Sequence, residues 1–180
     1  MVLRHYYRGG LVRHLSKDAF VYTGLENTRS LAELKMLQQM RELNLPVPNP
    51  IAARVERVKG LWCRNDILIE TLDNTTDGFH LLKQQGLSDA TWFAIGATIR
   101  RFHNAGVYHS DLNIHNLLID EAERVFLIDF DRCGFRAQDN RWQDENLARL
   151  HRSLLKEQGL HTDFNFTPDG WRQLMAGYKA

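Results

Sequence analysis

The stretch HSDLNIHNLLIDEAERVFLIDFD, residues 109–131, decides the fold of this chain. Two short apolar runs, Leu117–Ile119 and Val125–Ile128, lie on either side of a charged segment, Asp120–Arg124. Apolar runs of this length joined by a tight polar turn predict a β-hairpin. The hairpin would return the chain to the polar residues that precede it, so the end of the stretch would lie beside its beginning.

Three oxygen-bearing side chains would meet at that edge: Asp111, Asn116 and Asp129. The spacing of Asp111 and Asn116, with His109 two residues earlier, fits the kinase catalytic loop H-x-D-x-x-x-x-N. Asp129, followed by Phe130, fits the metal-binding Asp of the kinase D-F-G sequence. Both patterns in this order predict a site for phosphoryl transfer from a magnesium nucleotide. The alternative is that these residues only form a turn and end a strand.

Each of these residues has an expected role. Asp111 would accept the proton of the attacking hydroxyl or orient it, a contribution of roughly 10²–10⁴-fold for a positioned base. Asn116 and Asp129 would hold magnesium against the nucleotide phosphates, with waters completing the octahedron. His109 lies where kinases brace the loop by hydrogen bonding, although a role as base is the alternative.

A kinase site also requires a cation on an early strand, paired with an acid on the first helix. Residues 2–7 alternate apolar and basic side chains, which predicts a strand carrying Arg4 in the position of that cation. Glu33 is the corresponding acid, and Glu70 is a further candidate for contact with the nucleotide. The alternative places Arg4 and Glu33 on solvated surfaces, with Lys17 or Lys35 as weaker candidates for the cation.

Composition bounds the class of protein. The 180 residues, 43% hydrophobic and 25% charged, suit a soluble globular fold of one domain or of two small lobes. A net charge of +1 predicts no general attraction to nucleic acid. We find no run long enough to span a membrane and no signal peptide at the start. Cys63 and Cys133 show neither metal-binding nor disulfide spacing, which suits a reducing compartment.

The first part of the chain is expected to be rich in β-structure. A helix with a 3.6-residue apolar period is predicted over Arg29–Leu43, followed by a proline-rich extended segment. Ile51–Val58 and Leu61–Arg64 flank Lys59–Gly60 and predict a hairpin. Asn65–Asp66 would then turn the chain into a separate strand, Ile67–Leu72.

The second part is expected to be mainly helical. The polar segment Asp73–Gly78 predicts a loop and a boundary between lobes at residues 1–72 and 73–180. Ser88 and Thr167, the latter followed by proline, have the chemistry of helix N-caps. The predicted helices cover Phe79–Gln85, the segment after Ser88 as far as about residue 103, Asn140–Glu157 and the segment after Thr167.

Three departures from protein kinases concern the acceptor. Ser110 replaces the Arg of H-R-D, and Asp131 replaces the Gly of D-F-G, so a glycine's access to positive φ is lost. No A-P-E sequence follows, and the segment before the next helix is too short to dock a peptide. A small molecule or sugar is therefore the expected acceptor. The cations that follow Asp131 could contact an anionic acceptor or form a solvated basic loop: Arg132, Arg136 and Arg141.

Several segments together resemble the 3-deoxy-D-manno-octulosonic acid (Kdo) kinases, of the lipopolysaccharide kinase group of protein-kinase-like proteins in Gram-negative bacteria. The segments are LRHYYRGGL, ELNLPVPNP, HSDLNIHNLLI and LIDFDRC. The resemblance implies an α+β, two-lobe fold and transfer of phosphate from ATP, with magnesium, to the 4-hydroxyl of Kdo on lipid A precursor. It also implies peripheral association with the cytoplasmic face of the inner membrane. By position, Asp111 matches the catalytic Asp, and Asn116 and Asp129 match the metal-binding residues.

The resemblance also implies an N-terminal glycine-rich strand-turn-strand that covers the nucleotide phosphates. We expect this chain to begin after that lid, as a fragment or with a misassigned start, because Gly9–Gly10 follows the first strand rather than preceding it. Two alternatives to a Kdo kinase therefore stay open: a heptose or other small-molecule kinase of the same fold, and a catalytically silent, pseudokinase-like binding module.

Overall fold

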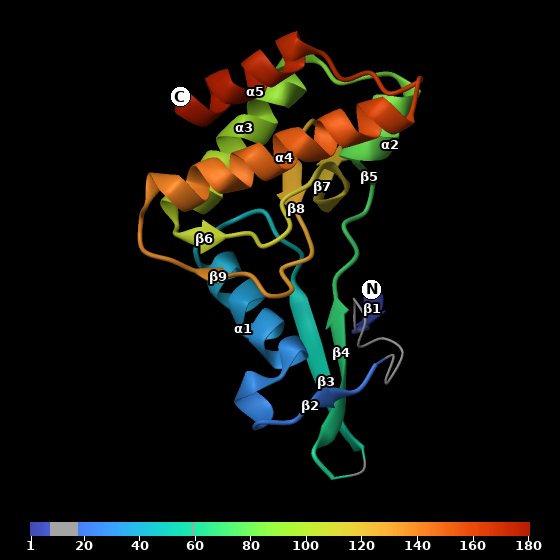
Figure 1. Cartoon of the computed structure of the whole chain (residues 1–180), viewed down its shortest axis with the longest axis vertical. Helices are drawn as coiled ribbons and strands as arrows, with labels where there is room; N and C mark the ends of the chain where they lie inside the picture. The colour runs from blue at the N-terminus through green and yellow to red at the C-terminus, as the bar shows by residue number, and fades with distance from the viewer. Residues whose placement is uncertain (8–17, 59) are drawn as a thin grey trace.

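The computed structural model of the chain describes residues 1–7, 18–58 and 60–180. A β-sheet covered by one helix lies at one end, and four helices gather at the other (Figure 1). Three sequence features fall wholly or partly outside the described residues: the Gly9–Gly10 pair, Lys17 and the Lys59–Gly60 turn.

The sheet is built around one central strand, β4 (Trp62–Ile69). Strand β3 (Pro50–Val58) pairs with one edge of β4 along its length. On the other edge, β1 (Val2–His5) pairs with the second half of β4 and β2 (Phe20–Val21) with its first half. Residues far apart in the chain are thereby joined, and the first strand lies beside the end of β4.

The predicted break at Asn65–Asp66 is wrong, because β4 runs through both residues without interruption. Asn65 is buried and its Oδ1 accepts a hydrogen bond from Ser30 Oγ at 3.1 Å. Asp66 Oδ1 lies 2.6 Å from His5 Nδ1 on the neighbouring strand. Partners within the sheet and its covering helix therefore satisfy two polar side chains that favour turns in isolation.

Helix α1 (Arg29–Glu42) covers the sheet, as predicted from its apolar period, after a short 3-10 turn, η2 (Leu25–Asn27). Its buried face carries Met36, Leu37, Met40 and the carboxylate of Glu33. The proline-rich segment that follows is not helical, as predicted, but it is not uniformly extended, because it bends at Pro46, where Val47 N donates to the carbonyl of Leu45 at 2.9 Å. The carbonyl of Pro46 accepts a hydrogen bond from Leu127 N at 3.1 Å. This contact ties the connection between α1 and β3 to the helical end of the molecule.

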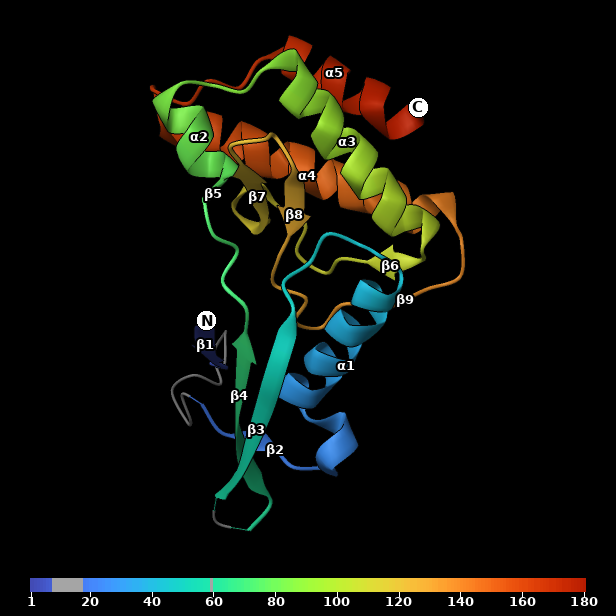
Figure 2. The ribbon, with the colours of Figure 1, turned by 180° about the vertical axis from the view of Figure 1, so that it is seen from behind.

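The helical end holds α2 (Gly78–Gln84), α3 (Asp89–Asn104), α4 (Asn140–Leu160) and α5 (Pro168–Lys179), seen from behind in Figure 2. Ser88 and Thr167 cap α3 and α5 as predicted, each accepting a hydrogen bond from a backbone N–H of the first turn. Helices α3 and α5 pack with their backbones in direct contact at Gly96 and Gly177, where a Cβ atom would collide with the backbone of the other helix. Helix α4 crosses in front of the small strands in Figure 1.

A small sheet beneath these helices contains the predicted hairpin, β7 (Leu117–Asp120) and β8 (Val125–Leu127). A third strand, β5 (Thr75–Asp77), pairs with β7. The prediction of a loop over Asp73–Gly78 is therefore wrong beyond its first two residues. Threonine suits an extended, half-buried position next to β7, and Asp77 is the N-cap of α2.

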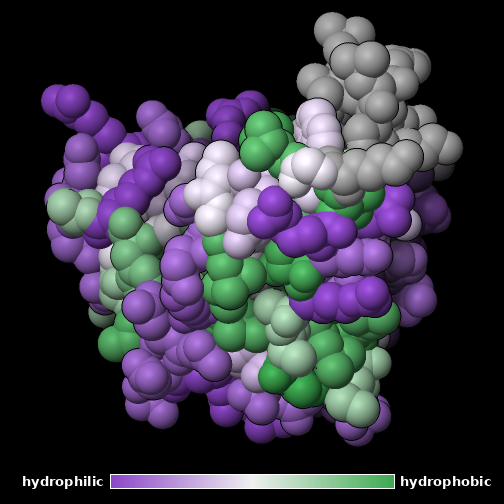
Figure 3. Space-filling view, turned by 90° about the horizontal axis from the view of Figure 1, so that it is seen from below, coloured by the Kyte–Doolittle hydropathy of each residue, from purple (hydrophilic) through white to green (hydrophobic). Residues whose placement is uncertain are grey.

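A two-stranded ladder, β6 (Val107–Tyr108) with β9 (Gly134–Phe135), completes the strands. Between β6 and β7 the chain makes a 3-10 turn, η3 (Ile114–Asn116). The N-terminal part of the molecule exposes a mixture of polar and apolar side chains when viewed from below (Figure 3). Within the described ranges, no helix has both the length and the apolar character needed to cross a membrane.

Candidate active site

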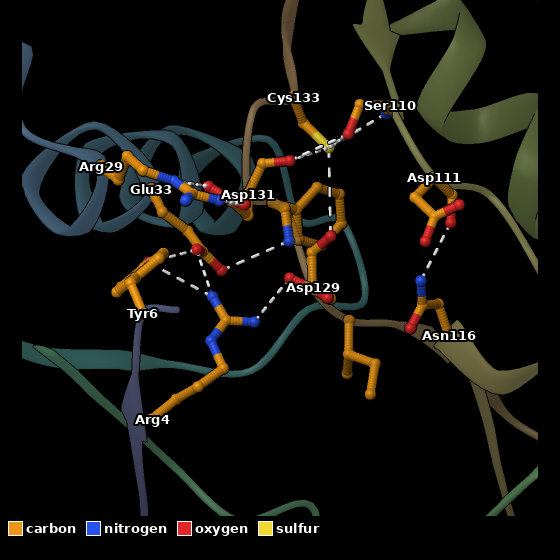
Figure 4. Close-up of polar contacts among 12 residues, drawn as sticks. Arg4, Tyr6, Arg29, Glu33, Ser110, Asp111, Asn116, Asp129, Asp131 and Cys133 are labelled. Carbon is orange, nitrogen blue, oxygen red and sulfur yellow. Dashed lines mark hydrogen bonds and ion pairs between the residues drawn. The ribbon is translucent and has the colours of Figure 1, made fainter. Parts of the chain in front are cut away.

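The loop between β6 and β7 carries the predicted catalytic residue. Asp111 is exposed, and Asn113 Nδ2 donates a hydrogen bond to its Oδ2 at 3.1 Å. Asn116 Nδ2 donates to the backbone carbonyl of Asp111 at 2.9 Å (Figure 4). Asn113 also caps the η3 turn, since its Oδ1 accepts hydrogen bonds from the backbone N–H groups of His115 and Asn116. The loop therefore presents the Asp111 carboxylate to solvent on a backbone that its own asparagines hold.

His109 lies beneath this loop, where the sequence predicted a bracing residue. The ring is buried; Nδ1 accepts a hydrogen bond from Asp111 N at 3.2 Å, and Nε2 donates to the carbonyl of Ile128 at 3.0 Å. Burial lowers the pKa of His109, and this outweighs its interactions with Ile128, Asp129 and Asp111. A neutral ring with both nitrogens engaged connects the Asp111 loop to the strand that leads to Asp129.

Asn146 on α4 is a second residue that braces the loop, and it was not among the predicted site residues. Its Oδ1 accepts from His109 N and its Nδ2 donates to His109 O, each at 3.1 Å. The side chain is buried, although asparagine disfavours a helix interior. The sequence did hold a signal for this residue: Asn146 precedes Leu150 and Leu154 by four and eight residues, so it lies on the same helix face as these buried leucines.

Arg4 stands between two carboxylates from distant parts of the chain. Its Nη1 donates to Asp129 Oδ1 at 2.7 Å, and its Nη2 forms an ion pair with Glu33 (Figure 4). Tyr6 donates its hydroxyl hydrogen bond to the same Glu33 carboxylate. Burial by itself would lower the pKa of Arg4, but attraction to Glu33, Tyr6 and Asp129 outweighs it and raises the pKa. Arg4 is therefore a permanent cation at this point.

Tyr6 is a functional residue that the sequence did not single out. It is buried, and burial together with the neighbouring Glu33 charge raises its pKa, so the hydroxyl stays a donor. Glu33 also accepts a hydrogen bond from Phe130 N through Oε1 at 3.3 Å. The signal was available in the alternation predicted over residues 2–7, which places Arg4 and Tyr6 two residues apart and therefore on the same side of an extended segment.

Ser110 and Cys133 explain the departure from the kinase H-R-D sequence. Ser110 Oγ donates to the carbonyl of Asp131 at 2.9 Å, and Ser110 N donates to Cys133 Sγ at 3.2 Å. Burial raises the pKa of the Cys133 thiol to about 11, so the sulfur stays protonated. A small hydroxyl residue thus joins the catalytic loop directly to the segment after Asp129.

A cleft of about 690 Å³ opens between the sheet and the helical end, beside Arg4. Arg4, Asn116 and Asp129 line one part of it. Glu70 also lines this cleft, and its backbone N donates a hydrogen bond to the carbonyl of Asn49 at 2.9 Å. Apolar side chains form the remaining walls: Val2, Ile69, Leu72, Leu118 and Ile128. The polar and apolar regions of the cleft suit a ligand with one charged end and one flat apolar end.

Magnesium and a nucleotide triphosphate fit the polar part. No described residue donates a hydrogen bond to Asn116 Oδ1 or to the second carboxylate oxygen of Asp129, so both oxygens are available to a hard cation. Elsewhere in the described ranges, no group of three His, Cys, Asp or Glu side chains gathers as a metal site. Two protein oxygens, completed by phosphate and water, form the ligand set that magnesium takes beside a nucleotide.

The arginines predicted to contact an acceptor occupy different environments. Arg132 lines a second hollow of about 470 Å³ together with Asp111, Asp129 and Asp131. Arg136 instead lies over the ring of Tyr108, with its guanidinium 3.3 Å from the ring centroid. Of these two cations, only Arg132 lies in a hollow with Asp111.

Comparison with solved structures places the fold. The chain aligns with a structure described as WaaP in complex with acyl carrier protein, with a TM-score of 0.63 and 21% identity. The alignment covers 83% of this chain and 66% of that one, so the chain spans just under two thirds of that protein. The fold is α+β and protein-kinase-like, with a small β-rich lobe and a helical lobe.

Sequence comparison places the chain more narrowly. The model of the lipopolysaccharide kinase (Kdo/WaaP) family matches residues 1–178. Three curated relatives are called 3-deoxy-D-manno-octulosonic acid kinase. They come from Actinobacillus succinogenes (44% identity, 98% of this chain, 74% of the relative), Photobacterium profundum (45%, 99% and 75%) and Haemophilus influenzae strain PittEE (46%, 98% and 74%). The chain belongs to the lipopolysaccharide kinase (Kdo/WaaP) family and is a kinase.

Proposed function

We propose that this chain transfers the γ-phosphoryl group of ATP to the 4-hydroxyl of a Kdo residue attached to lipid A precursor, in lipopolysaccharide biosynthesis. The observation that carries the proposal is the convergence of Arg4, Asn116 and Asp129 at one end of the cleft. Asp111 lies in the second hollow, which Asp129 also lines, and its backbone carbonyl accepts a hydrogen bond from Asn116. The name shared by the relatives, each about 45% identical over nearly the whole chain, supports the acceptor.

In this proposal Asp111 orients the attacking hydroxyl and takes its proton as the new phosphate ester forms. Its carboxylate is exposed and is steadied by Asn113, so an acceptor can reach it from solvent. His109 contributes by position only, because its buried neutral ring holds the loop rather than the substrate. Positioning of this kind accounts for much of the rate in phosphoryl transfer, which demands little covalent chemistry from the protein.

The nucleotide would occupy the cleft lined by Arg4 and Glu70, with its phosphates toward Asn116 and Asp129. These two residues would hold magnesium, which when bound neutralises charge on the transferring phosphate. Arg4 places a fixed positive charge at the same end, and Glu33 and Tyr6 hold its guanidinium in place. We retain the predicted lobe boundary at residues 72 and 73, beside this cleft, as part of the proposal.

A lipid-linked acceptor implies where the enzyme works. We propose peripheral association with the cytoplasmic face of the bacterial inner membrane, where both ATP and the lipid precursor would be accessible. This placement follows from the chemistry of the two substrates. We propose no nucleic acid partner.

The test is transfer of labelled phosphate from ATP and magnesium to Kdo-bearing lipid A precursor. Asp111→Asn keeps the shape of the side chain and should lower kcat by roughly 10²–10⁴-fold while nucleotide binding persists. Asp129→Asn should weaken magnesium-dependent nucleotide binding as well as transfer. Asp169→Asn, an exposed acid on α5, is the matched control and should leave both unchanged.

Three results would contradict the proposal. Equal rates of transfer for wild type and Asp111→Asn would contradict the catalytic role proposed for Asp111. Nucleotide binding without transfer to the Kdo acceptor would indicate another acceptor, such as a heptose. No magnesium-dependent nucleotide binding at all would favour a binding module.

A further inference from the structure

Helix α4 presents a row of cations next to the Asp111 loop. Arg149, Arg152 and Lys156 are spaced by three and four residues, which places them along one face of the helix. All three side chains line a hollow of about 370 Å³ whose other wall includes Asp111 and Asn113. The hollow therefore has the proposed catalytic carboxylate on one side and three positive charges on the other.

These three cations make few ion pairs or hydrogen bonds with described residues of the chain. Among residues 1–7, 18–58 and 60–180, neither Arg149 nor Arg152 has an ion-pair or hydrogen-bond partner for its guanidinium. Lys156 reaches Glu157 only at 3.6 Å, and that carboxylate also lies 3.4 Å from His115 and 3.5 Å from His161. Other exposed cations on the helices do pair with a neighbouring acid, as Arg172 does with Asp169 and Lys35 with Glu26. A solvated basic face would not require three cations to converge on one hollow.

The row is held at a fixed position relative to Asp111. The opposite face of α4 is buried through Leu150 and Leu154. Asn146 bonds both backbone groups of His109, and Ser153 Oγ accepts a hydrogen bond from Ile114 N at 3.3 Å. Both ends of the catalytic loop are thus attached to the helix that carries the cations, so a ligand held by the row is held relative to Asp111.

We propose that Arg149, Arg152 and Lys156 bind the carboxylate of the acceptor sugar while its hydroxyl faces Asp111. Guanidinium groups suit a carboxylate because they can donate two parallel hydrogen bonds to it. The same hollow includes Asp111, so the anion has to lie close to the reacting hydroxyl. This favours a carboxylate on the same sugar over the more distant phosphates of the lipid. The inference rests on the proposed function and assigns its specificity to α4.

Steady-state kinetics of single variants test the row. Arg149→Gln and Arg152→Gln should each raise KM for the Kdo acceptor by about 10-fold or more, the loss of one charge-assisted hydrogen bond. Lys156→Gln should raise it less, because the ammonium is a point charge beside Glu157. KM for ATP and kcat should stay within about twofold for all three. Arg172→Gln, an exposed arginine on α5, is the matched control and should change nothing.

Modified acceptors identify the group that is bound. Wild type should discriminate against an acceptor whose Kdo carboxyl is converted to the methyl ester, and Arg149→Gln/Arg152→Gln should lose that discrimination. With an acceptor that lacks the lipid phosphates, the variants should raise KM by the same factor as they do with the complete acceptor. If the variants respond only to removal of the lipid phosphates, or lose only binding to phosphatidylglycerol vesicles without acceptor, the carboxylate assignment is overturned.

Failure of the inference is distinct from failure of the proposed function. Transfer by wild type with unchanged acceptor KM in the variants overturns the inference alone. If wild type makes no transfer, the proposed function fails, and binding of free Kdo measured by NMR then decides. Binding weakened by Arg149→Gln/Arg152→Gln supports the row as a sugar-acid site, whereas equal or absent binding overturns it.

Discussion

Arg29 Nε donates a hydrogen bond to Asp131 Oδ1 at 2.8 Å, and a second guanidinium nitrogen contacts the other carboxylate oxygen. This pair joins the first residue of α1 to the segment after β8, across the site in Figure 4. The two residues before Asp131 are held in the same way: Asp129 by Arg4, and the backbone of Phe130 by Glu33. Three consecutive residues are therefore each tied to the β-rich lobe.

The Arg29–Asp131 pair should stabilise this arrangement measurably. Both side chains are about four-fifths buried, so the pair is less screened than a surface ion pair. In a double-mutant cycle with Arg29→Gln and Asp131→Asn, we expect a coupling free energy of about 0.5–3 kcal/mol in urea unfolding. The exposed pair of Arg54 and Glu56 provides the comparison and should give less than about 1 kcal/mol. Strictly additive effects of Arg29→Gln and Asp131→Asn would show that the contact is energetically unimportant.

Arg4 should not be replaceable by lysine. Its planar fork reaches Asp129 and Glu33 at once, whereas one ammonium on a flexible stem cannot reproduce that geometry. We expect Arg4→Lys to lower kcat at least about 10-fold, and Arg4→Met to cost about 3–5 kcal/mol of folding free energy by leaving Glu33 buried and unpaired. Kinetics and urea unfolding measure the two effects, with the exposed Arg54→Lys as control. Full activity of Arg4→Lys would remove the bridging role.

The contact between α3 and α5 predicts a steric effect. A Cβ at residue 96 would lie 1.9 Å from the carbonyl oxygen of Leu174, a backbone atom that cannot move by itself. Gly96→Ala should therefore destabilise the protein by about 1–3 kcal/mol or more as the helices separate. Gly159→Ala on α4, where a Cβ meets no atom within 4 Å, should instead stabilise it by about 0.5–1 kcal/mol. Thermal or urea unfolding of the two variants checks the difference, and equal effects would contradict the close packing.

Two buried histidines predict a loss of stability in acid. Burial lowers the pKa of His103 to about 4, and burial also lowers that of His109. The unfolded chain, with ordinary histidine pKa values near 6.5, binds more protons in this range. The stability is therefore fully present above about pH 6.5 and declines as the pH falls toward about 4, by on the order of 2–3 kcal/mol for His103.

A comparison of variants isolates this histidine from the carboxylates that also titrate in acid. His103 Nδ1 lies 2.8 Å from the hydroxyl of Tyr178, which donates to the neutral ring. His103→Gln should flatten the dependence of unfolding free energy on pH between about 6.5 and 4, whatever its effect at pH 7. His80→Gln, at an exposed position, should keep the wild-type slope. Parallel curves for His103→Gln and wild type would refute the assignment.

Local patterns account for what could be predicted. The β7–β8 hairpin follows from two apolar runs around a charged turn, and the start of α5 follows from Thr167 with Pro168. These features depend on neighbours in the chain, which the sequence displays directly. The break predicted at Asn65–Asp66 was wrong because their turn preference is offset by partners on α1 and β1, more than thirty residues away.

The sequence by itself determined the kind of site: the spacing of His109, Asp111 and Asn116, with Asp129 after a hairpin, requires no tertiary information. Only the tertiary structure decided what surrounds it. Tyr6 on Glu33, Asn146 on His109 and the cation row of α4 beside Asp111 are contacts between residues distant in sequence. A chain's local pattern records which side chains are available, but burial and long-range packing decide which of them meet and with what charge.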